Sequence, residues 1–257
     1  MKKQINILWT GGLDSTYRVL ELSMQEVTIQ PYYLASVNPS TKREIQAIHE
    51  LTETIKSRKE TKCELLPVKV VYADSIVPNE AIYHAWERLF EKTHLGSQYE
   101  FIARFAAQHN LVLELGIEKD PLESTIQRCL DMNGGGIIKD GYVMAHCETE
   151  DMRLIFSNMR FPLPLFEMTK QDEIAKYKEW HAEDVFSKIW FCYRPVNGKP
   201  CGLCDPCQTY IEVGLGSMIP TSRLLLYYMR KHFAFLFQSL RNIKHWFRDL
   251  RVSIKHK

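Results

Sequence analysis

The sequence predicts an α/β protein whose central sheet is parallel and covered by helices on both faces. Short apolar runs, each the length of a buried strand, alternate with segments of ten or more residues in which apolar side chains recur at helical spacing. Connections of that length allow crossovers between parallel strands. With 257 residues, 45% hydrophobic and 25% charged, the chain has the composition of a globular protein of one or two domains.

The first elements follow one another as strand, turn and helix. The apolar run Ile5–Trp9 predicts a buried strand, a glycine pair follows it, and residues 15–24 predict a helix capped at Asp14 or Ser15. Pro31 weakens the second expected strand because proline cannot donate to the ladder. By the same criteria we expect further strands at residues 28–37, 65–71 and 111–116, and further helices at residues 40–58, 81–92, 99–109 and 170–180.

We expect three parts along the chain. Residues 1–168 would form the sheet domain, residues 169–220 a small region with a cysteine cluster, and residues 221–257 a basic helical tail. The apolar run near the N-terminus is too short for a secretion signal, and no stretch reaches the ~18 apolar residues of a membrane span. The cytoplasm is therefore the expected compartment.

The loop after the first strand has the residues that a phosphate site needs. It consists of Thr10, Gly11, Gly12, Leu13, Asp14, Ser15 and Thr16. Glycines let the backbone approach phosphate oxygens, and the N–H groups of a helix N-terminus bind the anion. Ser15 and Thr16 add hydroxyl donors, and Asp14 would help to place Mg²⁺ or cap the helix. An ordinary strand-to-helix turn is the alternative, and the loop is not a Walker A motif because no Gly-Lys-Ser/Thr follows.

Four of the seven cysteines are clustered, at Cys192, Cys201, Cys204 and Cys207. Four thiolates at this spacing suit a tetrahedral Zn²⁺ ion, and Gly202 permits the tight turn between two of them. Because the run contains no histidine and no fifth ligand, a closed structural site is favoured over a catalytic one. Redox chemistry at a Cys-x-x-Cys pair and free thiols are the alternatives.

Charge is unevenly distributed, although the net charge is only +2. Residues 223–257 hold nine Lys or Arg and a single acid, whereas the rest of the chain holds 24 Lys or Arg and 30 acids. A basic amphipathic helix suits docking on the protein body or on a second copy in a homodimer, an anionic membrane surface, or RNA. The apolar residues with helical spacing are Leu236, Leu240, Ile243, Phe247, Leu250 and Ile254.

Two separated motifs resemble one family. The loop at residues 10–16 resembles the pyrophosphate loop (PP-loop) of the N-type ATP pyrophosphatases, whose usual first residue is serine. Its pairing with the downstream cysteines is similar to the 7-cyano-7-deazaguanine synthase branch, which also has the pair Cys192-Tyr193. Residues 116–120 resemble the family's Gly…Asp turn, and residues 168–174 resemble its Ser/Thr-Lys-x-Glu-Ile helix start. The resemblance spans about residues 5–213.

The resemblance implies a Rossmann-like, doubly wound parallel sheet of the adenine nucleotide alpha hydrolase-like kind, with ATP, Mg²⁺ and structural Zn²⁺. Residues 10–16 would hold the phosphates, with Gly116 and Asp120 at the neighbouring strand end. Lys170 would contact phosphate and stabilise developing charge, although a solvated helix start is an equal alternative for it. The residues in catalytic positions would be Asp14, Ser15 and Lys170.

The reaction that the resemblance implies is ATP-dependent ligation, as in queuosine biosynthesis. A carboxylate attacks the α-phosphate of ATP and releases pyrophosphate, and ammonia or another nucleophile then displaces AMP. The substrate would be a small molecule or modified purine, such as 7-carboxy-7-deazaguanine. The segments that shape the deazapurine pocket in the family are replaced here by residues 94–99 and 121–125, so the acceptor stays open.

Two other functions fit the same loop. A tRNA sulfurtransferase would use a reactive thiol, Cys129 or Cys147, and the basic tail as an RNA anchor. A third alternative, motivated by the altered segments, is a nucleotide-binding module or scaffold whose catalysis has lapsed.

Overall fold

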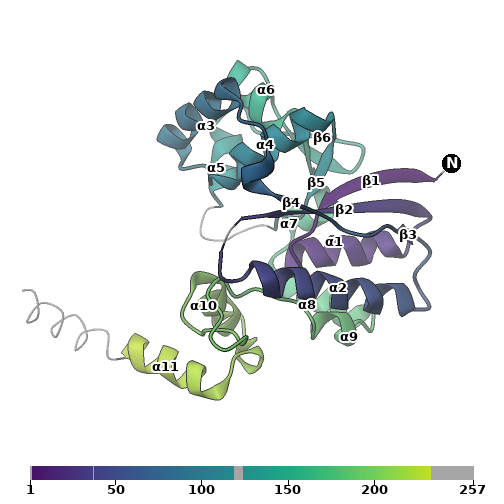
Figure 1. The fold of residues 1–257 in the computed structure, drawn as a ribbon, viewed down its shortest axis with the longest axis vertical. Helices are drawn as coiled ribbons and strands as arrows, with labels where there is room; N and C mark the ends of the chain where they lie inside the picture. Colours follow the sequence, from purple (N-terminus) through teal and green to yellow (C-terminus); the bar gives the residue numbers. More distant parts are fainter. Residues whose placement is uncertain (1, 37, 119–123, 233–257) are drawn as a thin grey trace, which may run out of the picture. The chain divides into compact units, whose positions relative to one another are not determined.

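The computed structural model describes residues 2–36, 38–118 and 124–232, and the chain divides into two compact units (Figure 1). The first unit spans Met1–Phe191 and contains the sheet, and the second spans Cys192–Lys257. The helix expected at residues 170–180 belongs to the first unit. Among the residues described, no helix is both long and apolar enough to cross a lipid bilayer.

The sheet of the first unit is mixed, with a predominantly parallel centre. Its order is β3-β2-β1-β5-β8-β7-β6, and β4 also pairs with β2. Strands β1 to β5 and β8 are parallel, whereas β7 pairs antiparallel with β8 and β6 pairs antiparallel with β7. The predicted parallel sheet is thus confirmed, with an antiparallel extension at one edge. The strands are β1 (Lys3–Leu8), β2 (Val27–Ala35), β3 (Glu64–Leu65), β4 (Lys69–Tyr72), β5 (Leu113–Leu115), β6 (Gly136–Lys139), β7 (Tyr142–Ala145) and β8 (Met159–Pro162).

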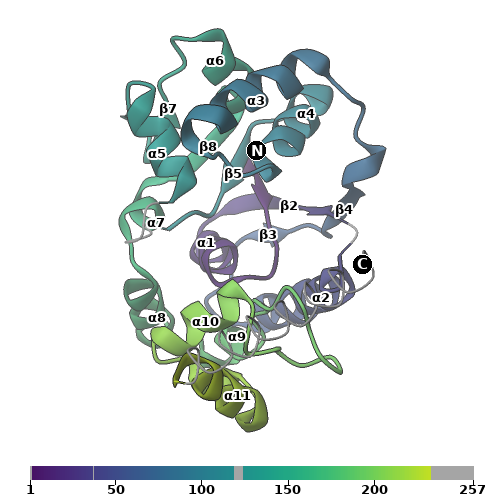
Figure 2. The same ribbon diagram turned by 90° about the vertical axis from the view of Figure 1, so that its left-hand side faces the viewer.

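Helices cover both faces of this sheet, as Figures 1 and 2 show, so the predicted doubly wound arrangement is present. One face carries α1 (Leu13–Ser23), α2 (Thr41–Ser57), α8 (Lys170–Glu179) and α9 (Glu183–Phe186). The other face carries α3 (Glu80–Thr93), α4 (Gln98–His109), α5 (Thr125–Met132) and α6 (Glu150–Phe156). Their apolar sides bury a core that includes Leu89, Phe105, Phe156 and Phe161. Two short helical segments, η1 (Ala73–Ser75) and α7 (Leu163–Glu167), complete the first unit.

The strand expected at residues 65–71 is two short strands, β3 and β4, that pair with β2 one after the other. Pro67, which has no N–H to donate, lies in the gap between them. Pro31 of β2 lies opposite the same gap, since β3 pairs with β2 only up to Ile29 and β4 resumes the pairing at Tyr32. The Gln30 side chain bridges the gap by donating to the carbonyl of Pro67 at 3.0 Å. Both prolines therefore lie at the same break in the pairing between β2 and its neighbours, where no backbone N–H is needed.

The segment between β5 and β8 contains elements that periodicity did not reveal. Strands β6 and β7 form a hairpin whose turn residues, Asp140 and Gly141, both have positive φ, 53° and 81°. Asp-Gly is the pair that such a two-residue turn favours. The pattern around residues 155–156, ambiguous in sequence, is helix α6 followed by strand β8. Strand β6 ends the described sheet and exposes both Ile137 and Ile138.

The second unit holds α10 (Asp205–Glu212), the 3₁₀ turn η2 (Gly216–Met218) and α11 (Thr221–His232). Tyr227 is the buried residue of α11, and its hydroxyl donates to Glu212 of α10 at 3.0 Å. The opposite side of α11 exposes Leu225, Tyr228 and Met229. Residues 233–257, most of the predicted basic tail, lie outside the described residues, so the helix expected there stays a prediction.

Candidate functional site

The glycine loop lies where the strand order of the sheet reverses. From β1 the chain continues to β2 on one side, and β5 later enters on the other side. In open α/β sheets, ligands bind outside the carboxyl ends of the strands at this switch point. The loop after β1 and the residues after β5, Gly116 to Glu118, flank that crevice.

The glycine loop is folded tightly and leaves the start of α1 open. Gly11 has φ of +74°, and its carbonyl accepts a hydrogen bond from the N–H of Trp190 at 2.9 Å. The Ser15 hydroxyl accepts from the N–H of Thr10 at 3.3 Å. Gly12 is the N-cap of α1, and no described side chain caps the helix. Its first N–H groups are therefore available to an anion, and phosphate binding by this loop stays a prediction.

Thr16 and Leu13 face the protein interior rather than the crevice. Thr16 is fully buried, and its hydroxyl accepts a hydrogen bond from the Trp9 indole at 2.9 Å. Leu13 is also buried, and its carbonyl accepts from the Tyr177 hydroxyl of α8 at 3.2 Å. These two residues thus brace the loop from inside.

Gly116 fits closely against the glycine loop. A Cβ atom at this position would lie 2.8 Å from Ser15 Cα and 2.9 Å from the carbonyl oxygen of Asp14. Only glycine permits this approach, which places the end of β5 directly against the start of α1. Asp120, expected at the same strand end, lies outside the described residues.

Lys170 reaches the glycine loop from α8. It is the first residue of that helix, whose N-terminus has a capping box made by Thr169 and Asp172. The Lys170 ammonium is 3.2 Å from Asp14 Oδ1 and also contacts Glu118. Burial alone would lower the pKa of Lys170, but the charges of Asp14 and Glu118 outweigh it and raise that pKa. Lys170 therefore lies beside the glycine loop, and its contact with phosphate stays a prediction.

Two carboxylates that were not predicted join this group. Glu118 follows β5, and Glu173 lies one turn after Lys170 on α8. Carboxylate oxygens of Asp14, Glu118 and Glu173 lie within 4.8 Å of one another. Both glutamates belong to segments that the family resemblance singled out, but nothing in their spacing indicates that they meet.

Burial dominates the electrostatics of the two glutamates. Glu173 is 0% exposed, and no N–H or hydroxyl group of the described residues donates to its carboxyl oxygens or to Glu118 Oε2. The two carboxyl groups are within hydrogen-bonding reach of each other, so a proton on Glu173 can be donated to Glu118. Burial raises the pKa of Glu118 to about 7, with Asp14 adding to the shift and Lys170 opposing it. Burial and the charges of Asp14 and Glu118 likewise raise the pKa of Glu173 well above its ordinary range. The site thus gathers three carboxyl groups around one ammonium group.

The four clustered cysteines converge in the second unit. One sulfur from each lies within 4.8 Å of the others, and the Cys201–Cys207 and Cys192–Cys204 sulfurs are both 3.9 Å apart. Backbone N–H groups of Leu203 and Cys204 donate to the Cys201 sulfur. Gly202 has φ of +73°, as expected for the turn between the cysteines. The sequence-predicted metal ligands are thus brought together.

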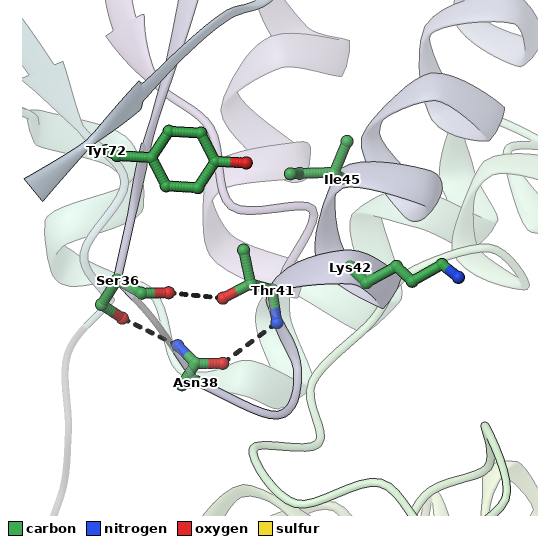
Figure 3. A pocket seen from close by; sticks show the side chains of 6 residues that line it. All are labelled: Ser36, Asn38, Thr41, Lys42, Ile45 and Tyr72. Atoms are coloured by element: carbon green, nitrogen blue, oxygen red, sulfur yellow. Dashed lines mark hydrogen bonds between the residues drawn. The ribbon is translucent and has the colours of Figure 1, made fainter.

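A separate pocket of about 350 Å³ opens at the carboxyl ends of β2 and β4 (Figure 3). Asn38 organises its floor by accepting from the N–H of Thr41 at 3.0 Å and donating to Ser36 at 2.7 Å. Tyr72 and Ile45 supply apolar walls, and Lys42 lines the edge, with its ammonium group directed away from Ser36, Asn38 and Tyr72 in Figure 3. Helix α2 lies beside both the pocket and the loop, because its first turn lines the pocket and a Cβ atom at Gly11 would lie 3.3 Å from the Ile48 side chain. The lining residues are Ser36, Asn38, Thr41, Lys42, Ile45 and Tyr72.

The two thiols considered for sulfur transfer are not activated. Cys129 is fully buried in the core of the first unit, and Cys147 is partly buried. Burial raises the pKa of both thiols. Reactive cysteines combine a lowered pKa with access to solvent, and neither thiol shows this combination.

Comparison with known proteins finds similarity among solved structures. No family model matches the chain, and no curated protein does. Among solved structures, a U34-tRNA thiolase, NcsA from Methanococcus maripaludis with its [4Fe-4S] cluster, is similar with a TM-score of 0.43 and 10% sequence identity. That similarity covers 90% of this chain and 72% of the thiolase chain.

Proposed function

We propose that this protein is an ATP-using enzyme of the PP-loop class that cleaves ATP between its α- and β-phosphates. The observation that carries the proposal is the uncapped start of α1 at the switch point of the sheet, faced by the Lys170 ammonium. Backbone N–H groups of the loop would hold the pyrophosphate part of ATP, and the Ser15 hydroxyl would add a donor. Lys170 would stabilise the charge that develops on the departing pyrophosphate.

The reaction that we propose is the ligation of a carboxylate to a nitrogen nucleophile. A carboxylate oxygen of the acceptor forms a bond to the α-phosphorus, and the bond from that phosphorus to the bridging oxygen breaks, releasing pyrophosphate. Ammonia then attacks the acyl carbon and AMP leaves, giving an amide after loss of a proton. This is the first half of the chemistry of 7-cyano-7-deazaguanine synthases, which the motifs at residues 10–16 and 192–207 resemble.

We assign the acceptor to the pocket of Figure 3. Its lining includes residues of α2, the helix that also lies beside the glycine loop, and it offers both a lysine and an aromatic side chain. Lys42 would pair with a carboxylate and Tyr72 would stack on a planar ring. We expect Tyr72→Ala and Lys42→Ala to raise the KM for the acceptor while leaving the KM for ATP unchanged. Equal changes in both KM values would contradict the assignment.

For the second unit we propose a structural zinc ion bound by the four cysteines. Thiolates around tetrahedral Zn²⁺, at ~2.3 Å from the metal, lie about 3.8 Å from each other, and two cysteine pairs here are 3.9 Å apart. A four-iron cluster holds each thiolate on a different iron and so needs wider spacing. The cysteine geometry therefore supports a single ion. The zinc would hold together the fold of residues 192–207 and supply no step of the reaction.

The test of the enzymatic proposal is pyrophosphate release from ATP with 7-carboxy-7-deazaguanine and ammonia, and then with a panel of other carboxylates. We expect acceptor-dependent release of pyrophosphate and AMP that falls at least about a hundredfold in Asp14→Ala and Lys170→Met, as expected for groups aimed at the transition state. Absence of ATP cleavage with every acceptor would overturn the proposal. Binding of ATP without AMP formation would instead indicate a nucleotide-binding module.

Sulfur transfer to tRNA is the competing outcome within the same loop class. The inert environments of Cys129 and Cys147 weigh against it. Thiolated tRNA formed by the wild-type protein, and lost in Cys129→Ser or Cys147→Ser, would replace the ligase proposal.

A further inference from the structure

We propose that Asp14, Glu118 and Glu173 form a binding site for a divalent cation of the Mg²⁺ or Mn²⁺ class that fills without nucleotide, and that the Lys170 ammonium is the counter-ion which this metal displaces. The inference deepens the proposed function, because the metal would be the one that accompanies ATP. It adds two ligands, Glu118 and Glu173, and a means of switching Lys170 between two partners.

The spacing of the three carboxylates suits a hard cation. One oxygen from each side chain lies within 4.8 Å of the other two. Ligands at 2.0–2.6 Å from Mg²⁺ or Ca²⁺ are at most about 4–5 Å apart across the metal. The three side chains come from the start of α1, the end of β5 and the first turn of α8, so the fold brings them together from distant parts of the sequence.

Buried oxygens without partners point to a missing ligand. Both oxygens of Glu173 and Oε2 of Glu118 are inaccessible to solvent, and apart from a proton that the two carboxyl groups can share, no described residue donates to them. A buried carboxylate without a donor or cation costs several kcal/mol. A metal ion would supply the positive partner that these oxygens lack.

Charge balance leads to the same conclusion. Three carboxylates face one ammonium, and Lys170 contacts only Asp14 and Glu118 among them. A divalent ion supplies the two positive charges that three ionised carboxylates and one lysine lack.

Exchange of cations would link metal binding to phosphate binding. When the metal occupies the carboxylates, the attraction that holds Lys170 on Asp14 and Glu118 is lost. The ammonium is then free to contact the phosphates at the start of α1. Without metal, the same ion pair keeps the lysine on the protein.

The test is titration of the nucleotide-free, full-length protein with Mn²⁺, followed by electron paramagnetic resonance of the free ion. We expect Mn²⁺ binding at one site per chain, weakened at least about tenfold by Glu173→Gln and by Glu118→Gln. Because Lys170 competes with the metal, Lys170→Met should tighten Mn²⁺ binding at least about tenfold. Loss of all binding in Lys170→Met would overturn the exchange of cations.

Two exposed residues of the same helix provide the matched controls. Lys178→Met and Glu179→Gln change the charge of α8 by the same amounts, but both side chains point to solvent. We expect Mn²⁺ affinity in these variants to equal that of the wild type. Equal effects of the control and the site variants would reduce the proposal to a general charge effect and overturn it.

Folding and function are separated by two further readouts. Because Glu173→Gln removes a buried acid, its melting temperature should equal or exceed that of the wild type, so weakened metal binding would not reflect unfolding. If the wild-type protein binds Mn²⁺ with the expected variant pattern but cleaves no ATP, the metal site stands and the proposed enzymatic function is overturned. If no Mn²⁺ binds in the absence of nucleotide and pyrophosphate release is insensitive to Glu173→Gln, the metal site is overturned and the proposed enzymatic function stands.

Discussion

At the scale of single residues, the candidate site depends on a contact that only glycine allows. Gly116 brings the end of β5 against the backbone of Asp14 and Ser15. Periodicity analysis treats this glycine as the end of a strand, and the family resemblance adds only a turn. The reason for glycine is a backbone contact between residues a hundred positions apart, which no local pattern records.

Gly116→Ala should therefore disturb the phosphate loop. The added methyl would meet backbone atoms at 2.8–2.9 Å, so the start of α1 must shift. We expect the variant to lose about 1–3 kcal/mol of unfolding free energy, as overpacked sites do, and to bind ATP at least about tenfold more weakly, or ~1.4 kcal/mol. Urea denaturation and calorimetry measure the two effects. Gly96→Ala is the control, because its new Cβ would have neighbours no closer than 3.8 Å and should change neither quantity.

A buried polar network gives a second prediction for individual side chains. Arg18 donates to Glu114 at 2.8 Å, and the Tyr142 hydroxyl contacts the same carboxylate. Arg18→Met leaves Glu114 as an uncompensated buried charge, so we expect a loss of about 3–5 kcal/mol in unfolding free energy.

Tyr142→Phe removes one hydrogen bond to a charged group and should cost about 1.5–3 kcal/mol. Urea unfolding monitored by circular dichroism measures both changes. Arg153→Met removes an exposed ion pair with Glu150 and should cost no more than about 1 kcal/mol. A loss in Arg18→Met as small as in this control would show that the network carries no net stability.

At the scale of elements, local pattern predicted the strands and helices that carry a strong apolar period. The helices α1 to α4 and α8 and the strands β1, β2 and β5 were predicted to within a few residues. The elements between residues 125 and 167 were not predicted, because they are short and several of their apolar residues are exposed. The one clear sequence feature in this segment was the Asp-Gly pair at residues 140–141, which is typical of a two-residue hairpin turn.

The start of α8 carries a prediction at this scale. Thr169 caps the helix by accepting from the N–H of Asp172, while the Asp172 side chain accepts from the N–H of Thr169. Thr169→Ala removes the first of these bonds and should cost about 0.5–2 kcal/mol. Because Lys170 is the next residue, the ATP affinity should fall as well. Thr169→Ser keeps the hydroxyl and should restore both the melting temperature and ATP binding; a serine variant as weak as the alanine variant would refute the capping explanation.

At the scale of the whole molecule, the sequence indicated an α/β fold and a cysteine cluster, and the structure contains both. Composition and spacing could not place Glu118 and Glu173, since their convergence depends on how the loops of three separate elements meet. From the sequence, a solvated helix start and a phosphate contact were equal interpretations of Lys170. Only the fold reveals that its ammonium group contacts Asp14.

Metal removal should act on one unit of the chain. If the four cysteines bind zinc, the purified protein contains about one zinc per chain, and a chelator strips the ion that crosslinks residues 192–207. We expect amide hydrogen exchange to accelerate in residues 192–232 and to remain slow in β1, β2 and β5. A purified protein that contains iron and sulfide in place of zinc would contradict the single-ion site.

The contact at Gly116 also determines which parts of the crevice can move when a ligand arrives. Asp14 lies within one of two backbone segments that meet at Gly116, and Glu118 lies two residues beyond that contact. Lys170 reaches them through a flexible side chain of four methylene groups. A ligand that enters the crevice therefore lies between these backbone segments and the Lys170 side chain. We expect the site to close around the ligand by rotation of the lysine side chain rather than by rearrangement of the sheet.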